Sequence, residues 1–185
     1  MTGLAIVLPG ANYTPAGPAI RFPVLAAWEA GYQSSVAVEY PPGAMRTQDL
    51  PAVVAEVRRQ LIGADFEEFD RMTVIAKSMG TRVVVEIADM LDRVEDLSIV
   101  WLTPLFGDRG IRDGAIGSGW RSLIVFGDQD PFHNEAGVTE VSQALQAPVV
   151  RVSGANHALE SPGDVIATIS GLREVTSAVQ EFLAP

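Results

Sequence analysis

A serine stands where a predicted strand meets a predicted helix in the stretch "VIAKSMGTRVVVEIA", residues 74–88. The apolar run before the serine predicts a buried strand, and the residues after it predict a helix. A turn this abrupt forces Ser78 into a strained backbone conformation, which small neighbours two positions away, Ala76 and Gly80, make tolerable. The stretch therefore approaches the nucleophile-elbow pattern G-x-S-x-G, with alanine in the first glycine position.

A nucleophilic serine needs a base within hydrogen-bond reach and an acid that orients the base. The chain contains two histidines, His133 and His157. His157 follows the last predicted strand by five residues, on a loop at the carboxyl end of the predicted sheet. We favour His157 as the base and interpret His133 as a surface or supporting residue, with His133 kept as the alternative base.

Two aspartates, Asp128 and Asp130, follow the predicted strand at 122–126, and either could orient an imidazole. Asp130 is favoured because it is the second acid of a Gly-Asp-x-Asp-Pro turn, which carries its carboxylate away from the strand end. The resulting order along the chain is nucleophile, acid and histidine.

An attacked acyl group develops a negative oxygen that backbone amides usually stabilise. The amide of Met79 opens the predicted helix, where the helix dipole also favours negative charge. We expect the second donor in the turn "LPGAN", where Gly10 lets the backbone turn and the amide of Ala11 points inward. Asn12 is the alternative donor.

Each candidate also has an ordinary structural interpretation. Ser78 could be a plain helix N-cap, because serine is favoured there. Lys77 could form a serine-lysine pair, but adjacent strand residues point to opposite faces, so we expect it to face away from Ser78. An acidic run is interpreted as a solvated loop rather than a metal site, because no histidine accompanies it. The run comprises Asp65, Glu67, Glu68 and Asp70.

Six apolar segments predict the strands that position these residues. They lie at 4–8, 35–40, 72–77, 97–102, 122–126 and 147–152. Most are continuously apolar, as expected of parallel strands covered on both faces. Helices are predicted at 17–31, 47–63, 79–92, 134–145 and 162–183. Alternating strands and helices indicate the α/β class.

The segment 103–120 has no clear period and is predicted to be a loop with one short helix, which could form a small lid. Four apolar residues of this segment could line an acyl pocket or pack in the core. They are Phe106, Ile111, Ile116 and Trp120.

Composition limits the classes of function. The 185 residues are expected to form one domain, 1–185, with 48% hydrophobic and 19% charged residues. A formal charge of −10 argues against nucleic-acid partners and anionic membranes. Cysteine is absent, and "LAIVL" is too short for a signal or spanning helix. We therefore expect a cytoplasmic protein.

Four stretches together resemble the α/β-hydrolase superfamily, and within it small lidless proteins similar to dienelactone hydrolase. They are "LPGAN", "AKSMG", "GDQDP" and "GANHALE", spread over residues 8–160. The resemblance implies a three-layer α/β/α sandwich with a mostly parallel six-stranded sheet of order 2-1-3-4-5-6. The eighteen residues at 103–120 are too few for the full cap domain of many relatives.

The resemblance also implies a serine hydrolase that cleaves a carboxylic ester, thioester or lactone through an acyl-enzyme intermediate. Ser78 would be the nucleophile, His157 the general base and acid, and Asp130 its orienting partner. Ala11 and Met79 would supply the oxyanion amides. No metal or organic cofactor is expected, the partner is a small-molecule acyl substrate, and a homodimer stays open.

The sequence departs from the family pattern at Ala76, at Lys77 and at Pro9, where many relatives have histidine. Two other functions stay open. One is a binding protein that keeps the fold without catalysis. The other is a flavodoxin-like phosphate or nucleotide binder that holds an anion at "LPGANYTP", although neither G-x-x-x-x-G-K-[ST] nor G-x-G-x-x-G occurs in the chain.

Overall fold

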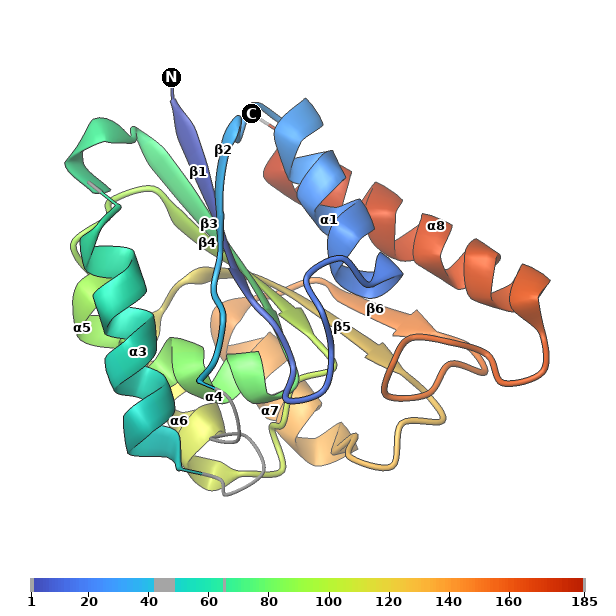
Figure 1. The fold of residues 1–185 in the computed structure, drawn as a ribbon. Coiled ribbons are helices and arrows are strands. Elements are labelled where there is room, and N and C mark those ends of the chain that lie inside the picture. Colours follow the sequence, from blue (N-terminus) through green and yellow to red (C-terminus); the bar gives the residue numbers. More distant parts are fainter. Residues whose placement is uncertain (1, 42–48, 65, 185) are drawn as a thin grey trace.

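The structure is a computed structural model that describes residues 2–41, 49–64 and 66–184 (Figure 1). Its strands are β1 Gly3–Leu8, β2 Ser34–Ala37, β3 Arg71–Lys77, β4 Leu97–Leu102, β5 Arg121–Gly127 and β6 Val149–Val152. Its helices are α1 Pro18–Glu29, α3 Leu50–Ile62, the 3₁₀ helix η1 Phe66–Glu68, α4 Met79–Glu86, α5 Ala88–Leu91, α6 Arg109–Ser118, α7 Glu135–Leu145 and α8 Val165–Leu183.

The six strands form one sheet in the order β2-β1-β3-β4-β5-β6. Every neighbouring pair is parallel. One row of the sheet runs from Val36 through Ile6 and Val74 to Ile99. The predicted α/β class and the strand order 2-1-3-4-5-6 are therefore confirmed, and the carboxyl ends of all six strands lie at one rim.

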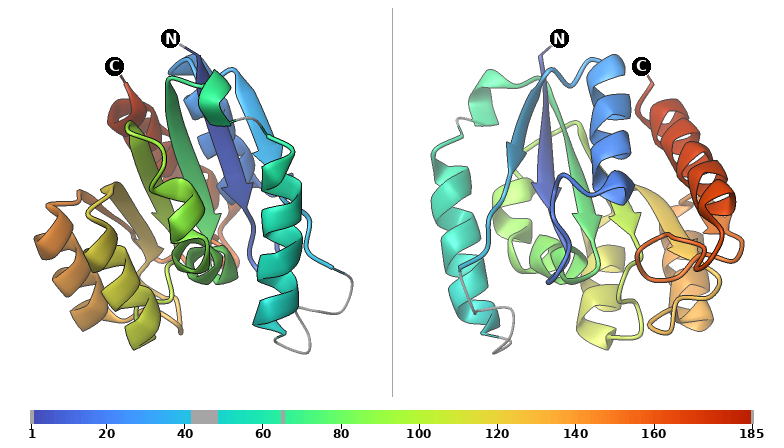
Figure 2. Two further views of the ribbon diagram at one scale, coloured as in Figure 1. Left: turned by 90° about the vertical axis from the view of Figure 1, so that its left-hand side faces the viewer. Right: turned by 45° about the vertical axis from the view of Figure 1, so that its right-hand side comes forward.

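Helices cover both faces of the sheet (Figures 1 and 2). Leu4, Ile6 and Leu8 of β1 pack in a core shared with α3, α4, α5, α6 and α7. Ala5 and Val7, on the other side of the same strand, pack in a core shared with α1 and α8. Because side chains alternate along a strand, both faces need apolar residues, and this explains the continuously apolar segments.

Helices α3, α6 and α8 each begin at a capping aspartate. The Asp49 carboxylate accepts a hydrogen bond from the Ala52 amide at the start of α3. The Asp164 carboxylate accepts one from the Ala167 amide, so α8 begins three residues later than the predicted 162. The predicted start of the second helix at residue 47 lies outside the described residues.

The single helix predicted at 79–92 is interrupted at Ile87, which separates α4 from α5. The backbone at Ile87 has φ −111° and ψ 14°, which is outside the helical range, although its amide still bonds the carbonyl oxygens of Val83 and Val84. The run of β-branched valines before it lowers helix propensity, which fits a break at this point.

The segment 103–120 contains more helix than the sequence predicts. Helix α6 spans ten residues, with Asp108 as its capping residue and Gly119 at φ 67° after its end. It packs beside α4 and α7 in the helical layer of the sheet (Figure 2). In the described part of the chain, the connection between β4 and β5 therefore holds one layer helix and no inserted cap domain.

The apolar residues of this segment belong to the core. Phe106 is fully buried, and its ring lies 5.5 Å from the ring of Trp101. Ile111 is buried with them, and the Trp120 indole donates a hydrogen bond to Asp92. Of the two interpretations of these side chains, core packing is the one that the structure supports.

Candidate active site

Ser78 forms the turn between β3 and α4 with no intervening residue. Its φ is 51° and its ψ is −114°, a conformation that is unfavourable for any residue with a side chain. The Ser78 amide donates to the Leu102 carbonyl at 2.9 Å, and the Ser78 carbonyl accepts from the Thr81 amide and hydroxyl at 2.9 and 2.6 Å. These three hydrogen bonds hold the strained turn in place.

The glycine of the elbow is required by close packing. A Cβ atom on Gly80 would lie 2.1 Å from the Leu8 carbonyl oxygen, so a side chain here would push α4 away from β1. The first position of the elbow pattern does not require glycine, because the methyl group of Ala76 is fully buried in the core. Alanine in the first position of the elbow pattern is therefore compatible with the turn.

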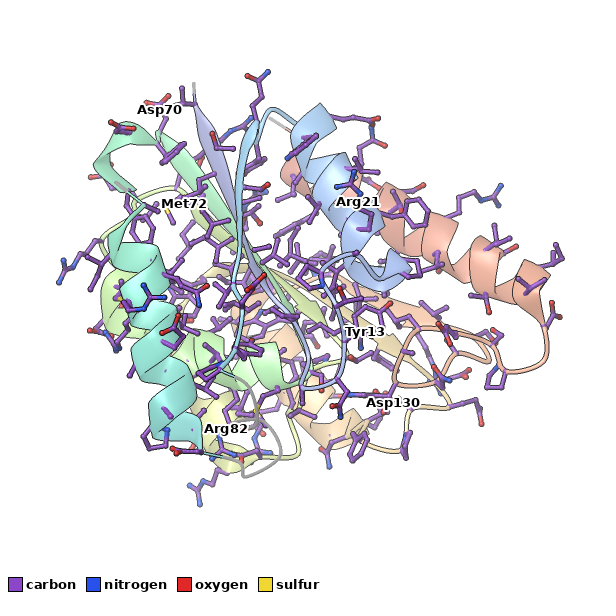
Figure 3. The ribbon with its side chains drawn as sticks, in the orientation of Figure 1. Tyr13, Arg21, Asp70, Met72, Arg82 and Asp130 are labelled. Atoms are coloured by element: carbon purple, nitrogen blue, oxygen red, sulfur yellow. The ribbon has the colours of Figure 1, made fainter. Side chains whose placement is uncertain are left out.

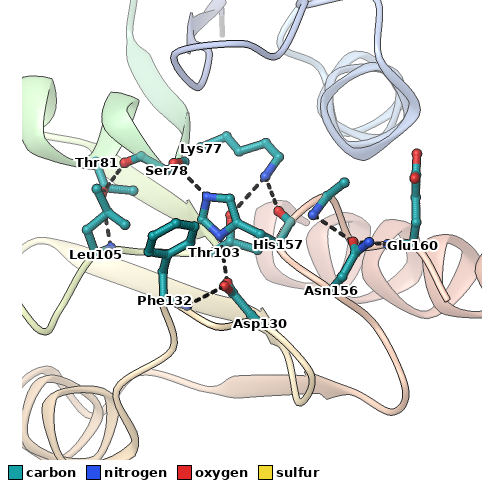
Figure 4. A network of polar contacts seen from close by, with 11 residues as sticks. Lys77, Ser78, Thr81, Thr103, Leu105, Asp130, Phe132, Asn156, His157 and Glu160 are labelled. Atoms are coloured by element: carbon teal, nitrogen blue, oxygen red, sulfur yellow. Dashed lines mark hydrogen bonds and ion pairs between the residues drawn. The ribbon is translucent and has the colours of Figure 1, made fainter. Parts of the chain in front are cut away.

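Three side chains from distant parts of the chain meet at the rim of the sheet (Figure 4). His157 Nε2 lies 2.7 Å from Ser78 Oγ, and His157 Nδ1 lies 2.7 Å from Asp130 Oδ2. Because a carboxylate accepts hydrogen bonds only, Nδ1 carries the ring proton in the neutral imidazole and Nε2 faces the hydroxyl as an acceptor. Ser78 occupies the N-cap position of α4, but its hydroxyl bonds the imidazole and makes no cap hydrogen bond.

Of the two candidate acids, Asp130 is the one that reaches His157. Its side chain is 2% exposed, and its second oxygen accepts from the Phe132 amide at 2.8 Å. Asp128 instead accepts from the Gly154 amide at 2.7 Å, and this hydrogen bond is the main reason why the pKa of Asp128 is lowered. Asp128 thus holds the start of the loop that carries His157, whereas Asp130 contacts the imidazole of His157.

The loop that carries His157 is fixed at several points. Gly127 ends β5, and a Cβ atom there would lie 2.1 Å from the Ala155 carbonyl oxygen, so this glycine lets the loop cross the strand end. The Asn156 side chain accepts from the amides of Ala158 and Glu160 at 2.8 and 3.2 Å. This loop geometry holds the imidazole at the rim.

The turn that is expected to supply an oxyanion amide lies against the serine. A Cβ atom on Gly10 would be 3.3 Å from Ser78 Cβ. The Tyr40 hydroxyl donates to the Pro9 carbonyl at 2.9 Å, so the turn is braced by a residue that follows β2. Ala11 follows Gly10 within this turn, and Met79 is the first residue of α4. Their roles as donors stay predictions.

Lys77 and Phe132 also contact the site. Sequence analysis expected Lys77 to face away from Ser78 and did not single out Phe132. The Lys77 ammonium bonds the His157 carbonyl oxygen, so this side chain points away from Ser78 as expected but still supports the site. The Phe132 ring is edge-on to the imidazole at 4.8 Å, and Phe132 is 60% exposed. The only sequence signal for either was proximity to a predicted catalytic residue.

His133 lies outside this network. Its Nε2 atom lies 2.9 Å from Glu135 Oε2, and its ring stacks on Phe126 with centroids 3.9 Å apart. The hydrogen bond from His133 is the main reason why the pKa of Glu135 is lowered. The interpretation of His133 as a supporting residue is consistent with these contacts.

Asp70, the last residue of the acidic run, lies far from the site. Asp70 is at the opposite end of the sheet from Asp130 (Figure 3), where it accepts from the Thr2 amide at 2.6 Å. Asp65 lies outside the described residues. Among the described residues, no three histidine or acidic side chains are grouped as a metal site would require. None of the described helices is both long and apolar enough to span a membrane.

Comparison with solved structures identifies the fold. A lidless α/β serine hydrolase from Xanthomonas campestris is 19% identical, with a TM-score of 0.59 over 97% of this chain and 80% of that one. The chain has the α/β-hydrolase fold. A protein from Thermoplasma acidophilum named a predicted CIB-like hydrolase is 18% identical, with a TM-score of 0.68 over 96% of this chain and 86% of that one.

An esterase from Pyrococcus furiosus is 19% identical, with a TM-score of 0.63 over 98% of this chain and 82% of that one. No family model matches the sequence, and no curated protein matches it significantly. At these identities the similarity establishes the α/β-hydrolase fold, so the function has to be argued from the side chains at the rim of the sheet.

Proposed function

We propose that this protein is a serine hydrolase that cleaves a carboxylic ester, thioester or lactone of a small or moderately sized acid. The observation that carries the proposal is the continuous line of hydrogen bonds from Ser78 through His157 to Asp130, with 2.7 Å at each step. Similar structures named hydrolase or esterase support the same reaction class.

In the acylation step, Ser78 Oγ attacks the acyl carbon while His157 Nε2 takes the hydroxyl proton. Asp130 keeps the imidazole in the required tautomer and stabilises the imidazolium that forms. The negative oxygen of the tetrahedral intermediate would be bound by the amides of Met79 and Ala11, and such donors typically contribute about 10²–10³-fold each in rate. His157 then gives its proton to the leaving oxygen or sulfur, and the acyl group stays on Ser78.

In the deacylation step, water takes the place of the leaving group. His157 Nε2 removes a proton from this water, whose oxygen attacks the acyl carbon, and the proton then returns to Ser78 Oγ as the free acid leaves. The side chains of the site complete this cycle without a metal or an organic cofactor.

The experiment that tests the proposal is the reaction of the full chain with a fluorophosphonate probe and with p-nitrophenyl esters of two, four and eight carbons. We expect Ser78→Ala to abolish labelling and to lower ester turnover by at least ~10⁴-fold, because the nucleophile is lost. Ser142→Ala, in α7 and outside the network of the site, is the matched control and should retain both. Full ester turnover by the Ser78 variant would remove the mechanism.

A further inference from the structure

Lys77 is a buried cation that the proposed mechanism does not use. It is the last residue of β3 and is 1% exposed. Its side chain follows Ile75 onto the face that α1 and α8 cover, whereas Ser78 turns into α4. A lysine is rarely buried so completely unless it is paired, so its contacts require an explanation.

The ammonium of Lys77 contacts three segments at the rim of the sheet, and Figure 4 shows its contacts with Thr103 and His157. Nζ donates to the His157 carbonyl oxygen at 2.5 Å and to Thr103 Oγ1 at 2.9 Å. It also lies 4.9 Å from the centre of the Tyr13 ring, within the range of a cation–π contact. One charged group thus links the segment before α1, the end of β4 and the loop before α8.

The contact with His157 is made to the backbone of the residue whose side chain faces Ser78. Moving this carbonyl would move the Cα atom and shift the imidazole from both of its partners, each 2.7 Å away. A hydrogen bond from a charged donor is about twice as strong as one between neutral groups. We propose that Lys77 is a positioning residue that fixes the His157 imidazole between Ser78 and Asp130 by holding the His157 carbonyl.

Burial lowers the pKa of Lys77 to about 8, although the negative charges of Asp130 and Glu160 act in the opposite direction. Tyr13 and His157 are the other titratable groups that face the ammonium, and burial raises the pKa of Tyr13. The charge of Lys77 therefore changes just above neutral pH. When it loses its proton, it loses its charge and one donor, and it holds the carbonyl less firmly.

This inference deepens the proposed function and rests on it. The test compares the wild type with Lys77→Met, which keeps an unbranched stem of four heavy atoms but removes the ammonium with its charge and donors. We expect kcat for p-nitrophenyl butyrate at pH 7 to fall about 10–100-fold, with KM within threefold, since Lys77 is argued to act through His157 and not through the substrate.

The pH profile separates positioning from simple core filling. In the wild type, kcat should fall as pH rises through about 8, the pKa of Lys77. The Lys77→Met profile should lack this alkaline fall, because the variant has no ammonium to lose. An unchanged kcat in the variant, or an alkaline fall that persists in it, would overturn the proposal.

Thr103→Val is the matched control, because it removes the other acceptor of the ammonium but leaves the bond to the His157 carbonyl. We expect its kcat to stay within threefold of the wild type, with the alkaline fall retained. A loss of kcat in Thr103→Val as large as that in Lys77→Met would show that Lys77 does not act through the His157 carbonyl, and it would overturn the proposal. If Lys77→Met does not fold, the wild-type profile decides, since a flat profile between pH 7 and 9.5 contradicts the inference.

Fluorophosphonate labelling of the wild type separates the two proposals. Labelling that depends on Ser78, together with unchanged kinetics in Lys77→Met, would defeat only the role of Lys77. Absence of wild-type labelling would defeat the proposed function. In that case proton NMR of the His157 Nδ1–H that bonds Asp130 still tests the positioning, and this signal should broaden or shift in Lys77→Met but not in Thr103→Val. An unchanged signal would overturn it.

Discussion

The two histidines of this chain each bind a carboxylate, yet the two pairs differ in every other respect. His157 and Asp130 lie 2.7 Å apart, with side chains 26% and 2% exposed. His133 and Glu135 lie 2.9 Å apart, with side chains 13% and 64% exposed. In the first pair the acid is buried, whereas in the second the acid is exposed to solvent.

The decisive difference is which ring nitrogen the acid occupies. Asp130 binds Nδ1 of His157, so Nε2 at the far side of the ring is left to face Ser78. Glu135 binds Nε2 of His133, the corresponding outer nitrogen, while the ring itself stacks on Phe126. A histidine-carboxylate pair is therefore insufficient as a sign of general-base chemistry, because the nitrogen that would meet the nucleophile must be unoccupied by the acid.

The largest expected effect on kcat comes from replacing each of the two histidines in turn by alanine. His157→Ala should lower kcat for an aryl ester by ~10⁴-fold or more, since both the base and the later acid are lost. His133→Ala should stay within threefold. Steady-state kinetics of the two variants, each checked for folding by circular dichroism, measure the contrast. Equal losses would mean that the two pairs are not functionally distinct.

The next effect concerns the acids. Asp130→Asn should lower kcat by ~10³–10⁴-fold, because an amide no longer selects the tautomer with the proton on Nδ1. Glu135→Gln keeps the shape of the other acid and should leave kcat unchanged within twofold. The pair of pH-rate profiles checks both expectations. Retained activity in Asp130→Asn would mean that the buried carboxylate does not orient the base.

A smaller effect is expected in the pH dependence of stability. The buried ammonium of Lys77 bonds the His157 carbonyl, and His133 has no such partner among the described contacts. Burial lowers the pKa of Lys77 from 10.5 to about 8, so above pH 8 the unfolded chain binds more protons at this residue than the folded one does. The lysine therefore destabilises the fold least at high pH. The free energy of unfolding of the wild type, minus that of Lys77→Met, should rise by ~2 kcal/mol from pH 7 to pH 9.5.

Urea unfolding of both proteins at several pH values measures this difference. Stability and activity should then move in opposite directions above pH 8, since deprotonation relieves a buried charge but weakens the hold on the histidine loop. A difference in unfolding free energy that is constant or falls with pH would show that burial does not lower the pKa of Lys77.

The smallest effect on the free energy of unfolding is expected at the pair formed by His133 and Glu135. His133→Ala removes a ring stacked on Phe126 at 3.9 Å and should lower the free energy of unfolding by ~1 kcal/mol. Urea unfolding of this variant checks the value. A loss above ~3 kcal/mol would mean that His133 supports the core, and not only the rim of β5.

Much of the fold follows from local patterns in the sequence. The central strands are predicted well because consecutive residues such as Val74 and Ile75 face opposite sides of a sheet that is covered on both faces, so both must be apolar. The edge strand β2 is less clear, since Ser34 and Ser35 are exposed and polar. The interruption at Ile87 was also missed, because a break of one residue hardly alters a helical pattern.

The candidate site also has a part that could be predicted from the sequence and a part that could not. Ser78, Asp130 and His157, which the structure brings together, could be predicted because each follows a strand end and all strand ends of a parallel sheet share one rim. The contact of Lys77 with the His157 carbonyl could not, because it depends on loop conformation. Leu159 in the loop that carries His157 has φ 61°, and the type of a residue gives little sign of such a backbone angle.

The strand order distributes the reactive groups unevenly along the polypeptide, with the serine in its first half and the acid and imidazole in its last third. During synthesis, Ser78 is added to the chain well before His157, the residue that its hydroxyl contacts. Helix α8, which completes one layer of the sheet, comes later still. Under the proposed mechanism, Ser78 would therefore gain an activating base only once the loops after β5 and β6 have folded against β3.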